Sequence, residues 1–179
     1  MAQDFRGAHR QQRHLWPGGD RQHLHQGTSL GRRRKRGAFE QALGISRGGR
    51  TSKLHALTDE KGRPRVFILT PGNSSDITVA ADLVERAGPI RKLLADKAYD
   101  ANHLRRLLAK RRIKAVIPST ASRSHPIPYD AEAYKQRNRI ERFWCRIKDW
   151  RRIATRYDKL ARNYLSGAYL AATLSCWIN

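Results

Sequence analysis

The segment that most restricts what this chain can fold into lies near its C-terminus. Tyr134, Arg137, Glu141 and Lys148 form the pattern Y-x2-R-x3-E-x6-K. Their offsets of three, four and seven place all four side chains on one stripe of a helix. One acid among cations on a single face is unsuited to a core, but it suits a carboxylate that holds a metal beside groups that contact phosphate. The alternative is an ordinary surface helix whose charges are solvated.

The same helix carries a second, apolar stripe. Ile140, Phe143, Trp144 and Ile147 follow the spacing i, i+3, i+4 and i+7, which defines a packing face. This face lies about 100° around the helix from the polar stripe. The helix can therefore pack on a core while it presents Glu141 at the edge of a cleft.

Charge indicates the partner. Among 179 residues, 37 Lys and Arg against 15 Asp and Glu give a formal charge of +22. So large an excess favours a polyanion, above all nucleic acid, because phosphate neutralisation and counterion release drive such binding. No apolar window approaches the length of a membrane-spanning helix, and no signal-peptide pattern opens the chain. Cys145 and Cys176 form neither a disulfide framework nor a zinc motif, so we expect a cytoplasmic protein without a membrane partner.

The chain divides into two parts. Residues 1–36 are rich in Arg, His, Gln and Gly, include GRRRKRG and show little apolar periodicity, so they predict a disordered basic segment. Residues 37–179 read as one α/β domain. A hairpin is followed by a strand–helix–strand unit, so we expect a mixed sheet flanked by helices. The predicted strands are 51–59, 64–72, 90–99 and 113–118, and the predicted helices are 74–88, 101–112, 131–151 and 162–179.

A second carboxylate follows a predicted strand. Asp96 comes after the apolar run KLLA, and ligand sites in open α/β sheets lie beyond the carboxyl ends of their strands. Asp96 and Glu141 could then share hard, oxygen-liganded ions, with Mg²⁺ the natural candidate. The alternative is a turn or capping acid within DKAYD, a role that fits Asp100 better than Asp96.

These motifs resemble those of a known family. ADKAYD around Asp96 and the Y-x2-R-x3-E-x6-K signature look like bacterial insertion-sequence transposases of the DDE type, of the group numbered five within the broader group numbered four. RGGRTSKLHALTDEKGRP, AVIPS and RRIATRYDKLARNYL are also similar to that group. The resemblance covers roughly residues 37–179.

The resemblance implies a ribonuclease-H-like fold and a set of roles. Asp96 would be the second catalytic carboxylate and Glu141 the third, both binding metal. Tyr134, Arg137 and Lys148 would be signature residues, with Lys148 in contact with the phosphate of the transposon end. Two Mg²⁺ ions would support strand cleavage at terminal inverted repeats and attack of the freed 3′-hydroxyl on target DNA, in a homodimer bound to double-stranded DNA. His55 lies where the family often has a histidine facing the site, although a hydrogen-bonded structural histidine fits equally well.

One element of the family is missing. The first catalytic Asp should lie on the first strand, in a context resembling IDSTYIKAHRS, but the chain has WPGGDRQHLHQGTSL there. Asp20 is present without an apolar strand around it, so the catalytic role does not transfer to it. We therefore expect the first strand to be missing or corrupted.

Codon arithmetic gives a specific hypothesis for this departure. Residues 16–30 can be encoded by codons that, when read one nucleotide later, give GLVAIDSTYIKAHRS, which restores the missing motif. Residues 1–36 would then be an out-of-frame translation and would contain no packed strand in register with the sheet.

Three functions remain in competition. The first is a DDE transposase, here a defective copy. The second is a non-catalytic basic DNA-binding protein on the same fold, and the third is another ribonuclease-H-like nuclease. The signature from Tyr134 to Lys148 favours the first over the third. If the first is right, the Asp96 and Glu141 side chains should converge.

Overall fold

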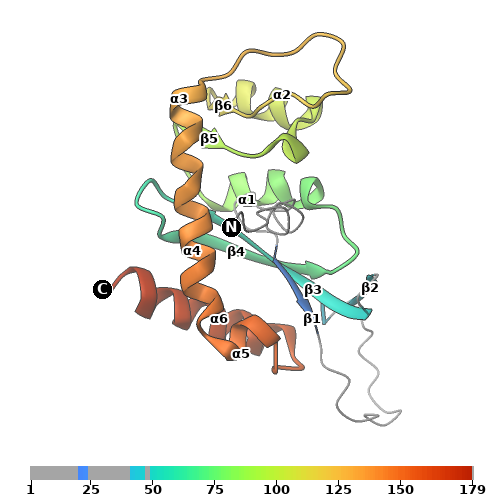
Figure 1. The fold of residues 1–179 in the computed structure, drawn as a ribbon, viewed down its shortest axis with the longest axis vertical. Helices are drawn as coiled ribbons and strands as arrows, with labels where there is room; N and C mark the ends of the chain where they lie inside the picture. Colours follow the sequence, from blue (N-terminus) through green and yellow to red (C-terminus); the bar gives the residue numbers. More distant parts are fainter. Residues whose placement is uncertain (1–19, 24–40, 47–48, 179) are drawn as a thin grey trace, which may run out of the picture.

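An antiparallel sheet forms the centre of the molecule (Figure 1). A computed structural model describes residues 20–23, 41–46 and 49–178 of the chain. The longest strand, β3 (Gly49–Thr58), pairs with β4 (Pro64–Pro71) in the predicted hairpin. The turn between them contains Gly62 at φ 79°, a left-handed conformation that glycine adopts without steric cost. Two short strands also pair antiparallel with β3. β1 (Asp20–His23) lies along the edge of β3 away from β4, and β2 (Gly44–Ser46) pairs with the first residues of β3 on the opposite edge from β1.

Strand β1 bears on one expectation. We expected no packed strand in register with the sheet within residues 1–36, and Asp20 pairs with Leu54 and His23 with Thr51. A strand in register is therefore present over these four residues, because strand pairing uses backbone groups and tolerates side chains that form no apolar pattern, and the expectation that no such strand is packed stays a prediction. Residues 1–19 and 24–36 lie outside the described part of the chain, so the expectation of disorder there stays a prediction.

The middle of the chain forms the predicted crossover. The 3-10 helix η2 (Asp76–Val79) runs into α1 (Ala80–Arg86), followed by β5 (Lys92–Leu94), the 3-10 helix η3 (Lys97–Tyr99), α2 (Asn102–Lys110) and β6 (Lys114–Val116). Strands β5 and β6 pair in parallel, as predicted. The single mixed sheet is not formed among the described residues, because β5 and β6 make a separate two-stranded sheet.

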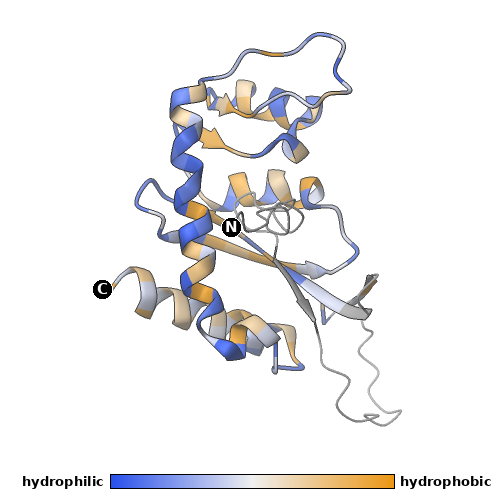
Figure 2. Cartoon of the chain, in the orientation of Figure 1, coloured by the Kyte–Doolittle hydropathy of each residue, from blue (hydrophilic) through white to orange (hydrophobic). Residues whose placement is uncertain are grey.

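The C-terminal part is helical. The predicted helix 131–151 consists of α3 (Ala131–Tyr134), the 3-10 helix η4 (Lys135–Arg137) and α4 (Asn138–Lys148), which follow one another as a single rod in Figure 1. Short helix α5 (Arg151–Thr155) leads to α6 (Ala161–Cys176). The rod passes alongside both sheets, and Figure 2 shows that hydrophilic residues dominate its upper part.

Two apolar cores lie on opposite faces of the hairpin. Along β3, Leu57 faces the core that α1, α2, β5 and β6 complete, whereas Leu54 and Ala56 face the core under α4 and α6. The period of two along a strand produces this division. The apolar stripe of α4 is confirmed, since its four predicted residues are all buried in the second core. None of the described helices is both long and apolar enough to span a membrane.

Truncation of this stripe should destabilise the domain. Phe143 stacks on Phe67 of β4 with 6.0 Å between ring centroids, so Phe143→Ala should lower the free energy of unfolding by about 3–5 kcal/mol. Cys145 is an exposed residue of the same helix, and Cys145→Ala should change the free energy of unfolding by less than about 0.5 kcal/mol. Urea unfolding of both variants measures the difference, and equal effects would contradict the packing described.

Candidate functional site

Asp96 lies just beyond the carboxyl end of β5, where the sequence predicted it. Its carboxylate accepts a hydrogen bond of 2.9 Å from the backbone N–H of Ala98 and so caps η3. The side chain is half-buried. The capping role that we assigned to Asp100 thus belongs to Asp96, because the chain turns into η3 directly after β5 and α2 begins later. A cap uses one of the two carboxylate oxygens, so it does not prevent Asp96 from binding a cation.

Glu141 lies on the polar stripe of the rod. Arg137 Nη2 donates to Glu141 Oε1 at 2.6 Å, with side-chain exposures of 23% and 36%. The Arg137 guanidinium also lies 5.6 Å from the ring centroid of Tyr134, within range of a cation–π contact. Tyr134, Arg137 and Glu141 therefore share one face although a 3-10 turn interrupts the helix.

The charges of both Asp96 and Glu141 influence the phenol of Tyr134. Burial raises the pKa of its phenol, the nearby Arg137 charge opposes that rise, and the negative charges of Asp96 and Glu141 both add to it. Both acids thus lie within electrostatic reach of one phenol, although they come from different elements. Convergence of the two carboxyl groups themselves stays a prediction.

The described residues do not complete a metal site. No group of three or more His, Cys, Asp or Glu residues in the described part of the chain is arranged to hold a metal ion. Asp96 is engaged with a backbone N–H and Glu141 with Arg137. Mg²⁺ demands near-octahedral oxygen coordination, and two carboxylates do not supply the set that two bridged ions need. The donors that the structure describes at Asp96 and Glu141 therefore do not by themselves fit the expected pair of Mg²⁺ ions.

The other two predicted residues are Lys148 and His55. Lys148 is exposed at the last position of α4, two helical turns beyond Glu141. His55 is fully buried, and its Nε2 lies 2.8 Å from Thr70 Oγ1. Burial lowers the pKa of His55 to about 4, so the ring is neutral near pH 7. The geometry favours the structural interpretation of His55.

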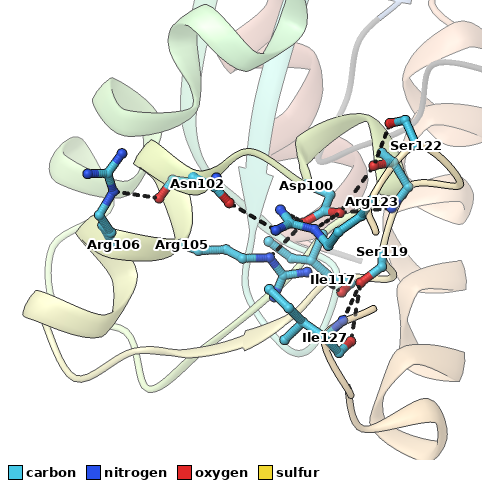
Figure 3. Close-up of polar contacts among 10 residues, drawn as sticks. Asp100, Asn102, Arg105, Arg106, Ile117, Ser119, Ser122, Arg123 and Ile127 are labelled. Carbon is cyan, nitrogen blue, oxygen red and sulfur yellow. Dashed lines mark hydrogen bonds and ion pairs between the residues drawn. The ribbon is translucent and has the colours of Figure 1, made fainter. Parts of the chain in front are cut away.

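Sequence reasoning missed the strongest polar cluster, which Figure 3 shows around Asp100. The Asp100 side chain is fully buried and accepts from Arg105 Nε at 2.7 Å and from Arg123 Nη2 at 2.8 Å. The backbone N–H of Thr120 donates to its other oxygen at 2.8 Å. These hydrogen bonds outweigh burial and hold the pKa of Asp100 well below its usual range.

The cluster fixes the loop that follows β6. Arg105 Nη2 also donates to the carbonyl of Ile117 at 2.8 Å, so α2, the end of β6 and the loop at 119–130 are tied to one carboxylate. Asp100 follows directly after η3, and the loop leads into α3, which carries Tyr134. The cluster therefore connects the turn of Asp96 with the base of the rod. Only the sequence proximity of Asp100 to Arg105 could have hinted at it.

A basic groove lies between the hairpin turn, β5 and the rod. It has a volume of about 720 Å³, and two acids, Asp59 and Glu60, line it. Asp59 is engaged with Arg63 at 2.7 Å. The groove is lined by eight cationic residues: Lys61, Arg63, Arg65, Arg91, Lys92, Lys114, Arg137 and Arg139. Its charge suits a polyanionic backbone.

Comparisons with known proteins agree with these features. The model of one protein family, described as a transposase DDE domain, matches residues 20–175. A protein of Brucella ovis, which its name assigns to insertion sequence element IS6501 as a transposase, is 35% identical over 125 residues, covering 69% of this chain and 96% of that relative. The chain therefore belongs to the DDE transposase family of bacterial insertion sequences, as the resemblance predicted.

A second relative is more distant. A protein of Burkholderia cepacia, named as a transposase for insertion sequence element IS402, is 30% identical over 137 residues. The match covers 70% of this chain but 63% of that relative, so the chain spans less than two thirds of it. No solved structure gives a significant match.

Loss of the Asp100 charge should destabilise the domain at neutral pH. Asp100→Asn leaves Arg105 and Arg123 without their carboxylate, so the free energy of unfolding should fall by about 2 kcal/mol or more. The folded pKa of Asp100 lies below the unfolded value, so its contribution is present above about pH 4 and is lost as the pH falls further. Urea unfolding should show a smaller difference in the free energy of unfolding between the unmodified chain and Asp100→Asn at pH 3 than at pH 7. A gap of equal size at both pH values would contradict the ion-pair account.

Proposed function

We propose that this chain derives from an insertion-sequence transposase whose site is built around Asp96 and Glu141. The observation that carries the proposal is the placement of both acids within electrostatic reach of Tyr134, in a chain of the DDE family. Asp96 and Glu141 would be the second and third carboxylates of strand cleavage and strand transfer. Arg137 would hold Glu141, and the exposed Lys148 would contact phosphate of the transposon end.

We further propose that the chain is a defective copy. When bound, two divalent ions supply the activated water and stabilise the leaving oxygen. Asp96 and Glu141 supply fewer fixed oxygens than two such ions need. The chain should therefore bind DNA without cutting it efficiently.

The proposed division of the chain follows from the same reasoning. Residues 37–179 would be the catalytic domain and residues 1–36 an out-of-frame segment. If the register of β1 with β3 were continued, Gly19, Gly18 and Pro17 would pair with residues 55, 56 and 57 in that order. These residue types are depleted in central strands, whereas the shifted reading offers Leu-Val-Ala there.

The partner in this proposal is double-stranded DNA, first at the terminal inverted repeats and then at the target, bound by a homodimer. The net charge of +22 and the basic groove support binding to phosphate. The runner-up function is a non-catalytic DNA-binding protein on the same fold. The incomplete carboxylate set favours it for this copy, and a cleavage assay separates the two.

Binding should depend on the groove and on salt. Arg91→Gln combined with Lys92→Gln removes two lining charges, so affinity for duplex DNA should fall and the slope of log K against log salt should decrease by about 1–2. A matched control, Lys110→Gln with Lys159→Gln, removes two exposed charges outside the groove lining. Fluorescence anisotropy across a salt series measures both. Equal losses in the two pairs would show that the groove has no special role.

Restoring the first strand should restore cleavage. The unmodified chain should give little Mg²⁺-dependent nicking of inverted-repeat DNA, because its donor set is incomplete. Replacing residues 16–30 with GLVAIDSTYIKAHRS should restore nicking, and Glu141→Gln in the restored protein should abolish it. A gel assay on labelled duplex measures all three. Robust nicking by the unmodified chain would refute the missing-acid argument.

A further inference from the structure

The outer face of α6 is apolar and turned to solvent. Its large side chains follow the spacing i, i+4, i+7 and i+8 of a helix packing face: Leu170, Leu174, Trp177 and Ile178. Their exposed fractions are 62%, 37%, 52% and 67% in that order. The inner side of α6 is buried in the core under α4, so these four residues, the α6 outer face, form a second apolar stripe. Figure 1 shows α6 on the opposite side of the hairpin from α1.

This face also lacks charge, in a chain that is otherwise strongly charged. Residues 163–179 contain no Lys, Arg, Asp or Glu, whereas 29% of the whole chain is charged. Within α6, charge is confined to Arg162, near the beginning of the helix. Two copies of a chain with a formal charge of +22 repel each other wherever their basic surfaces meet. On the α6 outer face, however, a second copy can dock without placing like charges opposite one another.

A cation that contacts this face is already paired. Arg63 lies over the Trp177 ring, with 4.2 Å between its guanidinium carbon and the ring centroid. Its Nη2 lies 2.7 Å from Asp59 Oδ2, so a carboxylate offsets the charge. The cation–π contact holds the ring in place while half of the Trp177 side chain stays exposed. A preorganised aromatic side chain of this kind is a typical anchor of protein interfaces.

We propose that the α6 outer face is a self-docking surface, on which a second copy of this chain places its own α6 antiparallel about a two-fold axis at Leu170. A two-fold interface uses the same patch on both copies, so the patch must be complementary to itself. Exposed residues with short side chains precede Leu170, namely Asn163 and Ser166, and large ones follow it, namely Leu174 and Trp177. The two ends of the stripe therefore differ in the way that an antiparallel pair requires.

The spacing of these residues is symmetric about Leu170. Ser166 and Leu174 are at i−4 and i+4 from it, and Asn163 and Trp177 are at i−7 and i+7. In the antiparallel pair, each large side chain meets a short one of the other copy, and Leu170 meets its own counterpart. A parallel pair would place the two Trp177 rings against each other and leave space between the two Ser166 side chains. The antiparallel pair fills the interface more evenly, as interior-like packing demands.

The size of the patch suits a dimer. The 16 residues of α6 span about 24 Å, and Trp150 extends the exposed aromatic surface beside it, since Trp150 Nε1 donates to Ser175 Oγ at 2.8 Å. Monomeric proteins rarely leave a contiguous apolar patch of more than a few hundred Å² exposed. The proposed function requires a homodimer on DNA, and this inference goes beyond it by assigning the surface through which the copies meet. It does not depend on Asp96 or Glu141.

Sedimentation equilibrium of the full chain without DNA tests the surface. The unmodified chain should dimerise at micromolar concentration, and Leu174→Glu should raise the dissociation constant of the dimer at least about tenfold, because it would bury an unpaired carboxylate. A matched control is Ala109→Glu, which adds the same charge at an exposed position of α2, at the other end of the molecule in Figure 1, and should leave the constant unchanged. Added salt should tighten the dimer, since it screens the repulsion between two basic copies, whereas it weakens binding to DNA.

Cysteine cross-linking tests the orientation. In a Cys145→Ser background, Leu170→Cys should form a disulfide between copies, because the two-fold axis brings the two positions together. Ser166→Cys alone should not, since its two copies would lie about 12 Å apart along the helix axis, but Ser166→Cys combined with Leu174→Cys should. All three positions are partly or fully exposed, and circular dichroism checks that each variant keeps its helices.

Three results would overturn the proposal: a monomer at micromolar concentration, equal weakening by Leu174→Glu and Ala109→Glu, or a cross-link through Ser166→Cys alone. The measurements without DNA also keep this inference apart from the proposed function. A dimer that is lost with Leu174→Glu, in a chain that neither binds nor cuts DNA, supports the surface and counts against the transposase proposal. A monomer that binds or cuts inverted-repeat DNA does the reverse.

Discussion

Burial of one helix face fixes the geometry of the candidate site. The apolar stripe of α4 packs against the β3–β4 hairpin, where Phe143 stacks on Phe67 with 6.0 Å between ring centroids. On a helix this burial determines the direction of every other side chain, so Glu141 is held on the polar side next to Arg137. The Asp100 cluster fixes the opposite end of the same arrangement, because it ties the loop before α3 to the turn that begins at Asp96.

Most of the elements that could be predicted from the sequence have a local pattern of residues. The apolar and polar stripes of α4 have helical spacing, and the hairpin alternates with a clear turn, so both could be predicted from neighbours in the chain. The Asp100 cluster could not, since it depends on Arg123 meeting an acid 23 residues earlier. The split between two sheets could not be predicted either, because strand order is a long-range property. The strand predicted within residues 90–99 was expected to end at Asp96, and the chain leaves the sheet after Leu94 and turns at Asp96.

Two observations concern the position of the first strand. The described sheets are separate where a strand between β3 and β5 would join them, and the family match begins at Asp20, where β1 begins. The four residues of β1 pair their backbone with residues 51–54 of β3, and none of the four is apolar. Under the proposed function, the chain would keep the supports of Asp96 and Glu141 and lack the first acid of the family, so binding and cleavage should separate.

The nucleotide sequence of codons 16–30 tests the central claim most directly. The account predicts that reading one nucleotide later yields an uninterrupted Gly-Leu-Val-Ala-Ile-Asp-Ser-Thr. This requires Asp20 to be encoded by GAT and Arg21 by a codon ending in GA, since the next codon begins with C. Any other arginine codon at position 21 gives no aspartate in the shifted frame. Such a codon would contradict the out-of-frame origin of the segment and leave the missing carboxylate unexplained.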